Sequence, residues 1–94
     1  MKKQKTEEQK YIFHLLDEVN ALDDFMLEAK FITGEKKLYD VKPLIERYHM
    51  FSIFKKDKNL FYKYNISGGY ALVWNDQVDL HCNELWKNGL EINY

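Results

Sequence analysis

The stretch that decides the fold is Phe25–Ile45, FMLEAKFITGEKKLYDVKPLI. Apolar residues recur at every second position through its first seven residues, which is the period of a half-buried strand. A second strand ends near Val41, and Pro43 then opens a helix, because a proline at the first helical position loses no hydrogen bond. The stretch therefore predicts a β-hairpin followed by a helix.

The turn of this hairpin sets its register. A two-residue turn would force the β-branched Thr33 to positive φ, whereas the three-residue loop Ile32-Thr33-Gly34 puts glycine in the left-handed position. That loop sets Leu27 opposite Tyr39, so both apolar sets share one face. A slip by one residue would instead oppose Leu27 to Asp40.

The helix opened by Pro43 carries one apolar stripe, and we expect this stripe to cover the shared face of the hairpin. The stripe consists of Leu44, Ile45, Tyr48 and Phe51. The face it would cover consists of Phe25, Leu27, Phe31, Tyr39 and Val41.

The rest of the chain adds short elements around this unit. Residues 62–66 and 70–74 are predicted to be strands joined by Ser67-Gly68-Gly69, and Asn75-Asp76 turns into a strand over 77–80. A short helix is predicted over 83–88, with Gly89 after its end. The fold class is therefore α+β: a small antiparallel sheet, one helix on a face and a short C-terminal helix.

The N-terminal residues allow two interpretations. Residues 1–10 form a charged leader, which we expect to be partly disordered, and residues 11–94 form a single domain. Thr6-Glu7-Glu8-Gln9 matches a capping box, and the apolar residues that follow have helical spacing, so periodicity predicts a helix over about 7–20.

Composition narrows the class of protein. The single cysteine, Cys82, excludes an internal disulfide and fits a reducing compartment, and no apolar run approaches the length of a membrane span. We therefore expect a cytoplasmic protein. Residues 11–29 hold five acids and no Lys or Arg, whereas residues 30–63 are basic. Opposed patches of this kind favour self-association or a charged partner, unless folding interleaves the two signs.

The segment Ser52–Lys63, SIFKKDKNLFYK, suggests a nucleic-acid patch as an alternative function. Its aromatic rings would stack bases while its ammonium groups hold phosphates. The competing interpretation turns the rings inward and the lysines to water, so that nucleic acid is not a partner. The basic residues concerned are Lys55, Lys56, Lys58 and Lys63.

A small enzyme is the third hypothesis, and the residues argue against it. The ionisable or nucleophilic candidates are His14, His49, Asp79, His81, Cys82 and Glu84. Neighbouring residues such as His81 and Cys82 point apart, zinc would need further ligands, and Asp79 is more simply a capping carboxylate. We predict no catalytic residue, cofactor, metal site or small-molecule substrate.

In their order and spacing, the motifs resemble the bacterial family called domain of unknown function 2442. The motifs are Phe31-Ile32-Thr33-Gly34-Glu35, Tyr39-Asp40-Val41, Pro43-Leu44-Ile45, Val73-Trp74-Asn75-Asp76-Gln77, Asp79-Leu80 and Leu85-Trp86, and the resemblance covers residues 14–88. Thr33 and Gln77 depart from the family pattern, which has Asn and a turn Gly there, so the second turn is expected to differ in type. The family implies a strand at about 15–21, and we prefer that strand to the helix.

The functional implication of the resemblance is a partner protein. Relatives often stand beside a second gene in a toxin–antitoxin-like arrangement, and the helix-turn-helix extension of some relatives has no counterpart here. We therefore expect a non-catalytic interaction module that forms a homodimer or half of a heteromeric pair. Large amphipathic side chains suited to the interface are Tyr62, Tyr64, Tyr70 and Trp74.

Overall fold

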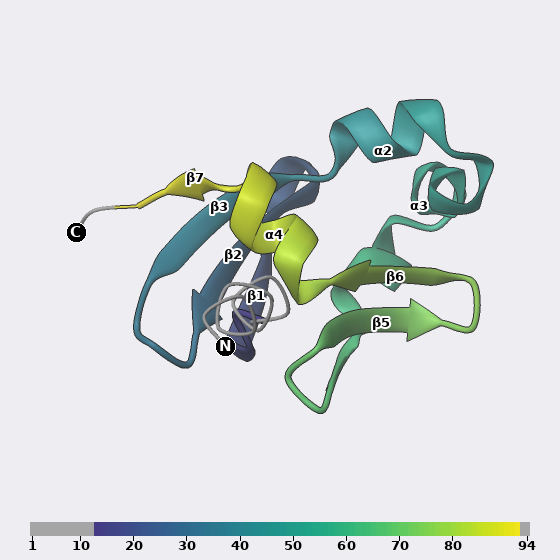
Figure 1. Cartoon of the computed structure of the whole chain (residues 1–94). Helices are drawn as coiled ribbons and strands as arrows, with labels where there is room; N and C mark the ends of the chain where they lie inside the picture. Colours follow the sequence, from purple (N-terminus) through teal and green to yellow (C-terminus); the bar gives the residue numbers. More distant parts are fainter. Residues whose placement is uncertain (1–12, 93–94) are drawn as a thin grey trace, which may run out of the picture.

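The computed structural model describes residues 13–92, which form two antiparallel sheets and several short helices (Figure 1). The elements are β1 (Leu16–Leu22), η1 (Asp23–Phe25), β2 (Met26–Phe31), β3 (Lys36–Asp40), α2 (Lys42–Arg47), η2 (His49–Ser52), α3 (Ile53–Lys56), η3 (Lys58–Tyr62), β4 (Asn65–Ser67), β5 (Ala71–Asn75), β6 (Val78–His81), α4 (Cys82–Asn88) and β7 (Leu90–Glu91). The four-stranded sheet has the order β1-β2-β3-β7, and the three-stranded sheet has the order β4-β5-β6. The predicted α+β class is confirmed.

The hairpin of β2 and β3 has the predicted register. Leu27 pairs with Tyr39, and the Phe31 N–H donates to the Glu35 carbonyl, which closes a three-residue loop. Gly34 has φ +100°, so glycine occupies the left-handed position as expected. The Thr33 hydroxyl donates to the Glu35 carboxylate and lowers the pKa of that group. This hydrogen bond gives the unusual Thr33 a role within the turn.

The helix that covers the hairpin is not the one we predicted. The inner face of the hairpin is buried, but α4 packs against β3, whereas α2 packs mainly against η2 and α3. Figure 1 shows α4 lying across the four-stranded sheet, with the three-stranded sheet on its other side. The predicted stripe is only partly realised: Ile45 and Phe51 are buried in the core, but α2 ends at Arg47 and the backbone becomes extended at Tyr48, which leaves that ring 45% exposed.

The strand β1 settles the N-terminal alternative in favour of the family pattern. Val19 pairs with Ala29 and Ala21 with Leu27, so β1 is a strand and the predicted helix over 7–20 is wrong from Leu16 onward. Pairing with β2 satisfies backbone groups that a lone amphipathic helix would satisfy internally, and tertiary structure overrides the local pattern. The capping box Thr6–Gln9 lies outside the described residues.

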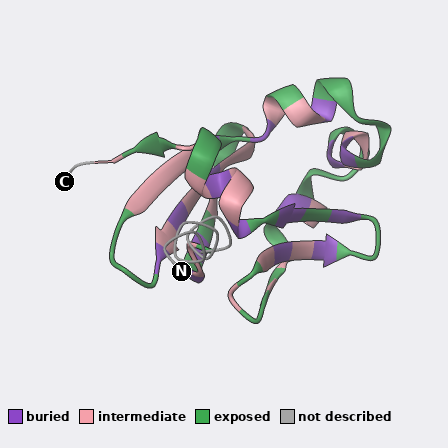
Figure 2. Cartoon of the chain, in the orientation of Figure 1, coloured by how far each residue is buried: buried purple, intermediate pink, exposed green. Residues whose placement is uncertain are grey.

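An aromatic core joins the two sheets. The Phe54 ring lies 5.3 Å from Phe61 and 5.2 Å from Trp74, measured between ring centroids. Phe25 packs on the same rings although its φ is +57°, a conformation that is strained for a bulky residue. Figure 2 shows buried residues on the strands and on α2, α3 and α4, while the turns are mostly exposed. The core is therefore shared by both sheets.

The second half of the chain follows the prediction with shifted boundaries. The strand predicted over 62–66 is only β4, because the chain from Lys58 to Tyr62 forms the 3₁₀ helix η3. The turn after β5 is held by Asn75 Oδ1, which accepts from the N–H groups of Gln77 and Val78. Gln77 keeps a negative φ, so this turn needs no glycine.

The cap of α4 corrects another expectation. His81 Nδ1 accepts a hydrogen bond of 3.1 Å from the Asn83 N–H, so His81 caps this helix and Asp79 lies exposed on β6. Gly89 follows the helix as predicted, but its φ is −79° rather than left-handed. A Cβ atom at Gly89 would lie 2.5 Å from the Leu85 carbonyl oxygen, so close packing, not φ, requires glycine here.

Candidate protein-binding groove

The outer edge of β3 is only partly covered. β7 pairs with Lys37 and Leu38, and the residue that would oppose Asp40 in the same register is Asn88, which belongs to α4. The chain after β3 turns away into α2. The strand edge is therefore open at Asp40, between β7 on one side and α2 on the other.

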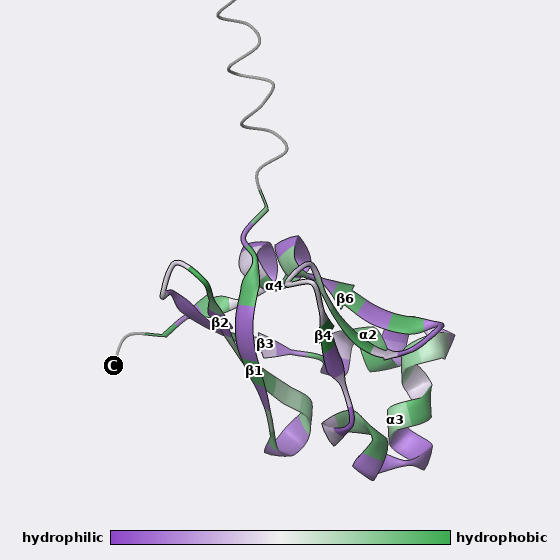
Figure 3. Cartoon of the chain, turned by 90° about the horizontal axis from the view of Figure 1, so that it is seen from below, coloured by the Kyte–Doolittle hydropathy of each residue, from purple (hydrophilic) through white to green (hydrophobic). Residues whose placement is uncertain are grey.

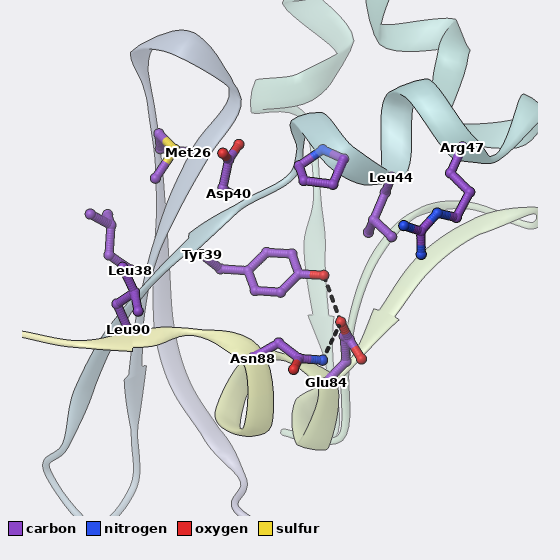
Figure 4. A pocket seen from close by; sticks show the side chains of 10 residues that line it. Met26, Leu38, Tyr39, Asp40, Leu44, Arg47, Glu84, Asn88 and Leu90 are labelled. Atoms are coloured by element: carbon purple, nitrogen blue, oxygen red, sulfur yellow. Dashed lines mark hydrogen bonds between the residues drawn. The ribbon is translucent and has the colours of Figure 1, made fainter.

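A groove of about 530 Å³ lies at this open edge (Figure 4). Its lining is mostly apolar and comes from β2, β3, α2, α4 and β7: Met26, Leu38, Tyr39, Asp40, Pro43, Leu44, Arg47, Glu84, Asn88 and Leu90. Leu90 is 72% exposed, the largest exposed fraction among the large apolar residues of the described chain. The groove is therefore an apolar surface that the fold leaves accessible to a partner.

A hydrogen-bonded group forms the floor of the groove. The Tyr39 hydroxyl donates to Glu84 Oε2 at 2.7 Å, and the Asn88 side-chain amide donates to the same oxygen at 2.9 Å. Burial, reinforced by the nearby Glu84 carboxylate, raises the pKa of Tyr39. The tyrosine ring therefore stays neutral and fixes α4 against β3 (Figure 4).

A cluster centred on Lys42 fixes the wall of the groove at the start of α2. Lys42 Nζ lies 3.0 Å from a carboxylate oxygen of Asp24 and 3.0 Å from one of Asp40, and it also donates to the Asp24 carbonyl. The hydrogen bonds that Lys42 donates to Asp24, and secondly to Asp40, raise the pKa of Lys42. Asp24 has φ +63°, so this clamp holds the strained turn η1 beside the start of α2.

Arg47 is the remaining charged residue of the groove. Figure 4 shows its guanidinium on the α2 side, directed toward the groove that Tyr39 and Glu84 line from the other side. Within residues 13–92 no hydrogen bond or ion pair engages this guanidinium. The groove thus combines apolar walls with one positive group that has no internal partner.

The structure divides the predicted interface residues into two kinds. Trp74 is buried, and its indole N–H donates to the Phe61 carbonyl at 2.9 Å, so the residue belongs to the core. The Tyr64 hydroxyl donates to the Val19 carbonyl and accepts from the Ala21 N–H, so this residue is also internal. Tyr62 and Tyr70 remain exposed, at 49% and 48%. Trp74 is therefore not available as an exposed interface residue, and the hydroxyl of the partly buried Tyr64 is already engaged within the molecule.

The predicted basic residues all lie on the surface, as their charge requires. Lys55, Lys56, Lys58 and Lys63 are exposed. Phe54 and Phe61 are buried, which leaves Tyr62 as the one ring of this segment exposed to solvent. Lys55 Nζ also pairs with a Glu46 carboxylate oxygen at 3.2 Å. The rings therefore turn inward, and base stacking by Phe54 or Phe61 is excluded.

Of the candidates for chemistry, only His81 and Cys82 are in contact in the described chain: Cys82 Sγ lies 3.8 Å from His81 Nδ1, so the expectation that these neighbours point apart is wrong. Cys82 is fully buried, and burial raises the pKa of its thiol, which disfavours the reactive thiolate. His81 caps α4, His49 is exposed on η2, and the His14 ring stacks on Trp86 at 3.8 Å. In the described part of the chain, no three His, Cys, Asp or Glu residues lie together as metal ligands would.

Among residues 13–92, no helix combines the length and the apolar character that crossing a bilayer requires.

Sequence reasoning missed most of the groove. It treated Leu44 as part of a covering stripe and did not consider Met26, Leu38, Arg47 or Leu90 as site residues. The missed element was β7, whose alternating residues Leu90-Glu91-Ile92 carried a weak strand signal after Gly89. That signal covers only three residues, which is too few to predict a strand without a known pairing partner.

Comparison with known proteins adds a family but no activity. No significant match was found among curated proteins or among solved structures. A family model described as a protein of unknown function, DUF2442, matches residues 16–91, from the first strand to the last. That match takes in both sheets and every element that lines the groove. The chain therefore belongs to the DUF2442 family of proteins of unknown function.

Proposed function

We propose that this chain is a non-catalytic module that binds another protein through the groove at the open edge of β3. The observation that carries the proposal is the groove itself, which joins apolar side chains from four elements, β2, β3, α2 and β7, around a strand edge. Unpaired strand edges and exposed apolar patches both favour association with a second chain. The proposed partner is the second member of a two-protein pair.

The proposal is supported by the way the groove is built. Its floor is fixed by the Tyr39–Glu84–Asn88 hydrogen bonds and its wall by Lys42, so the binding surface is already organised before a partner arrives. A preorganised surface loses less conformational entropy on binding. The exposed Leu90 and the partly buried Leu38 and Leu44 supply apolar area for contact.

The test compares two exposed aliphatic residues at different places on the surface. Leu90→Lys introduces a charge at the groove, and Ile32→Lys introduces the same charge in the β2–β3 loop, where Ile32 is 61% exposed. Each tagged variant and the unchanged protein are used to isolate partners from the source cells. The isolated partner is then purified separately and its affinity for each form is measured by calorimetry.

We expect the unchanged protein and Ile32→Lys to bind one purified partner with defined stoichiometry and Leu90→Lys to lose it. Equal binding by both variants would place the interface elsewhere. Recovery of this chain alone as a dimer, or recovery of no protein, would contradict a heteromeric partner.

A further inference from the structure

We propose that the groove receives its partner as an added β-strand along β3, and that Arg47 selects a carboxylate on that strand. This inference rests on the proposed function and specifies the mode and chemistry of recognition at the same site. In strand addition, main-chain hydrogen bonds hold the incoming segment and side-chain pockets select its sequence.

The backbone of β3 points the required groups outward. The Val41 N–H donates to Phe25 on the β2 side, whereas the Lys36 carbonyl accepts from Ile92 on the β7 side. Because these directions alternate along a strand, Leu38 and Asp40 both direct their backbone groups away from β2. Leu38 is paired with Leu90, but no strand residue of the described chain lies opposite Asp40. One donor and one acceptor are therefore available beside the groove.

The side chains at the edge suit an extended segment. Met26 is opposite Asp40, and Leu38 is opposite Leu90, so these apolar residues lie on the outer face of the sheet. Tyr39 lies on the inner face, toward Leu44 and Arg47 (Figure 4). Successive residues of an added strand point to opposite faces, so alternate side chains would meet the leucines and the Tyr39–Arg47 side.

The charges at the groove favour an acidic residue on the partner. The Asp40 carboxylate is held by Lys42, and Glu84 accepts hydrogen bonds from both Tyr39 and Asn88. Only the Arg47 guanidinium, among the charged lining residues, has no partner within the described chain. A guanidinium matches a carboxylate in a two-pronged arrangement, which gives direction as well as attraction.

The experiment is selection from a phage-displayed library of random twelve-residue peptides on the immobilised protein. Parallel selections use Arg47→Gln, which removes the charge, and Arg47→Glu, which reverses it. Arg47 is exposed and unpaired, so both variants are expected to fold, and circular dichroism checks this. Leu90→Lys serves as the variant with a damaged groove.

We expect the unchanged protein to enrich peptides with apolar residues at alternate positions and Asp or Glu at one fixed position. Arg47→Glu should enrich Lys or Arg at that position, and Arg47→Gln should show neither preference. A synthetic peptide of the enriched sequence should bind Arg47→Gln at least about tenfold more weakly than the unchanged protein. Its binding should also slow hydrogen exchange of the Asp40 amide.

The outcomes separate the two proposals. One outcome is that peptides bind the unchanged protein but not Leu90→Lys, which keeps the groove as the binding site. If those peptides show helical spacing, or an acidic preference that survives Arg47→Glu, strand addition with Arg47 is overturned. Peptides that bind Leu90→Lys as well as the unchanged protein contradict both proposals. Failure to enrich any peptide counts against strand addition by a linear segment, and the Leu90→Lys partner experiment then decides the proposed function separately.

Discussion

At one edge of the four-stranded sheet, the Tyr64 hydroxyl accepts from the Ala21 N–H and donates to the Val19 carbonyl, and the Leu16 N–H donates to the Gly69 carbonyl. At the opposite edge, two residues of β7 cover β3 and leave Asp40 open. Figure 3 shows β1 of the four-stranded sheet beside β4 of the three-stranded sheet. The β1 edge is thus satisfied from within the molecule, whereas the β3 edge remains able to pair.

The two edges place the same kind of side chain, a tyrosine, in two different settings. Both edges carry a tyrosine with a raised pKa, but Tyr64 closes the edge with its hydroxyl while Tyr39 forms the floor of a groove. We therefore expect substitutions near β1 to change stability and substitutions near β3 to change binding. The predictions below test that division.

The largest effect is expected at Trp74, which supports the closed edge. Its ring packs against Phe61 and lies 6.1 Å from Tyr64, so Trp74→Ala should lower the free energy of unfolding by about 3–5 kcal/mol. Urea denaturation followed by circular dichroism measures this change. Tyr70→Ala, at an exposed aromatic residue, is the control, and equal losses in the two variants would mean that Trp74 is not a core residue.

Tyr64→Phe isolates the hydroxyl that closes the β1 edge. The variant keeps the ring but leaves the Val19 carbonyl and the Ala21 N–H without their partner, so the free energy of unfolding should fall by about 1–3 kcal/mol. Tyr62→Phe removes a hydroxyl from an exposed ring and should change it by less than about 0.5 kcal/mol. A stability unchanged by Tyr64→Phe would contradict the closure of this edge.

The raised pKa of Tyr39, on β3, predicts that the free energy of unfolding falls at high pH. Its folded pKa is raised above the ordinary 10.0, so the folded state holds the proton more tightly than the unfolded chain. The contribution is fully present below pH 10.0 and is lost as pH rises through the folded pKa, by up to about 1.4 kcal/mol for each pH unit.

Stability curves at pH 8 and above pH 10 for the unchanged protein and Tyr39→Phe measure this term. The fall should be smaller in the variant. An identical fall in both proteins would show that other groups, such as Tyr64, account for it.

The smallest stability effect is expected at Arg47. Because its guanidinium has no partner in the described chain, Arg47→Ala should change the free energy of unfolding by less than about 0.5 kcal/mol. Binding of the partner should nevertheless weaken. A loss of stability similar to that of Tyr64→Phe would mean that Arg47 serves the fold and would remove the contrast between the two edges.

The hairpin could be predicted from the sequence because its information is local. Thr33 and Gly34 allow one loop length, and that loop pairs Leu27 with Tyr39. The inward rings of Phe54 and Phe61 were one of two stated alternatives, and burial decided between them. The strand β1 needed the family resemblance, because its residues also fit a helix.

The groove could not be predicted, because its residues are brought together from distant elements. Leu90 reaches β3 only through the packing of Gly89 against Leu85 and Lys37, and the unpaired state of Arg47 depends on where α2 ends. The burial of Trp74, which the sequence analysis assigned to an interface, has the same origin, since a large amphipathic side chain suits a core and a surface equally well.

The sequence by itself determined the class of the fold, the hairpin register and the family, because turn chemistry and strand periodicity act between residues close in the chain. The tertiary structure alone decided which helix covers the sheet, which tyrosines are internal and which strand edge stays open. These features depend on contacts between segments tens of residues apart, such as Tyr64 with β1 and Tyr39 with Glu84. Such contacts leave no periodic pattern in the sequence, because only the folded chain brings the partners together.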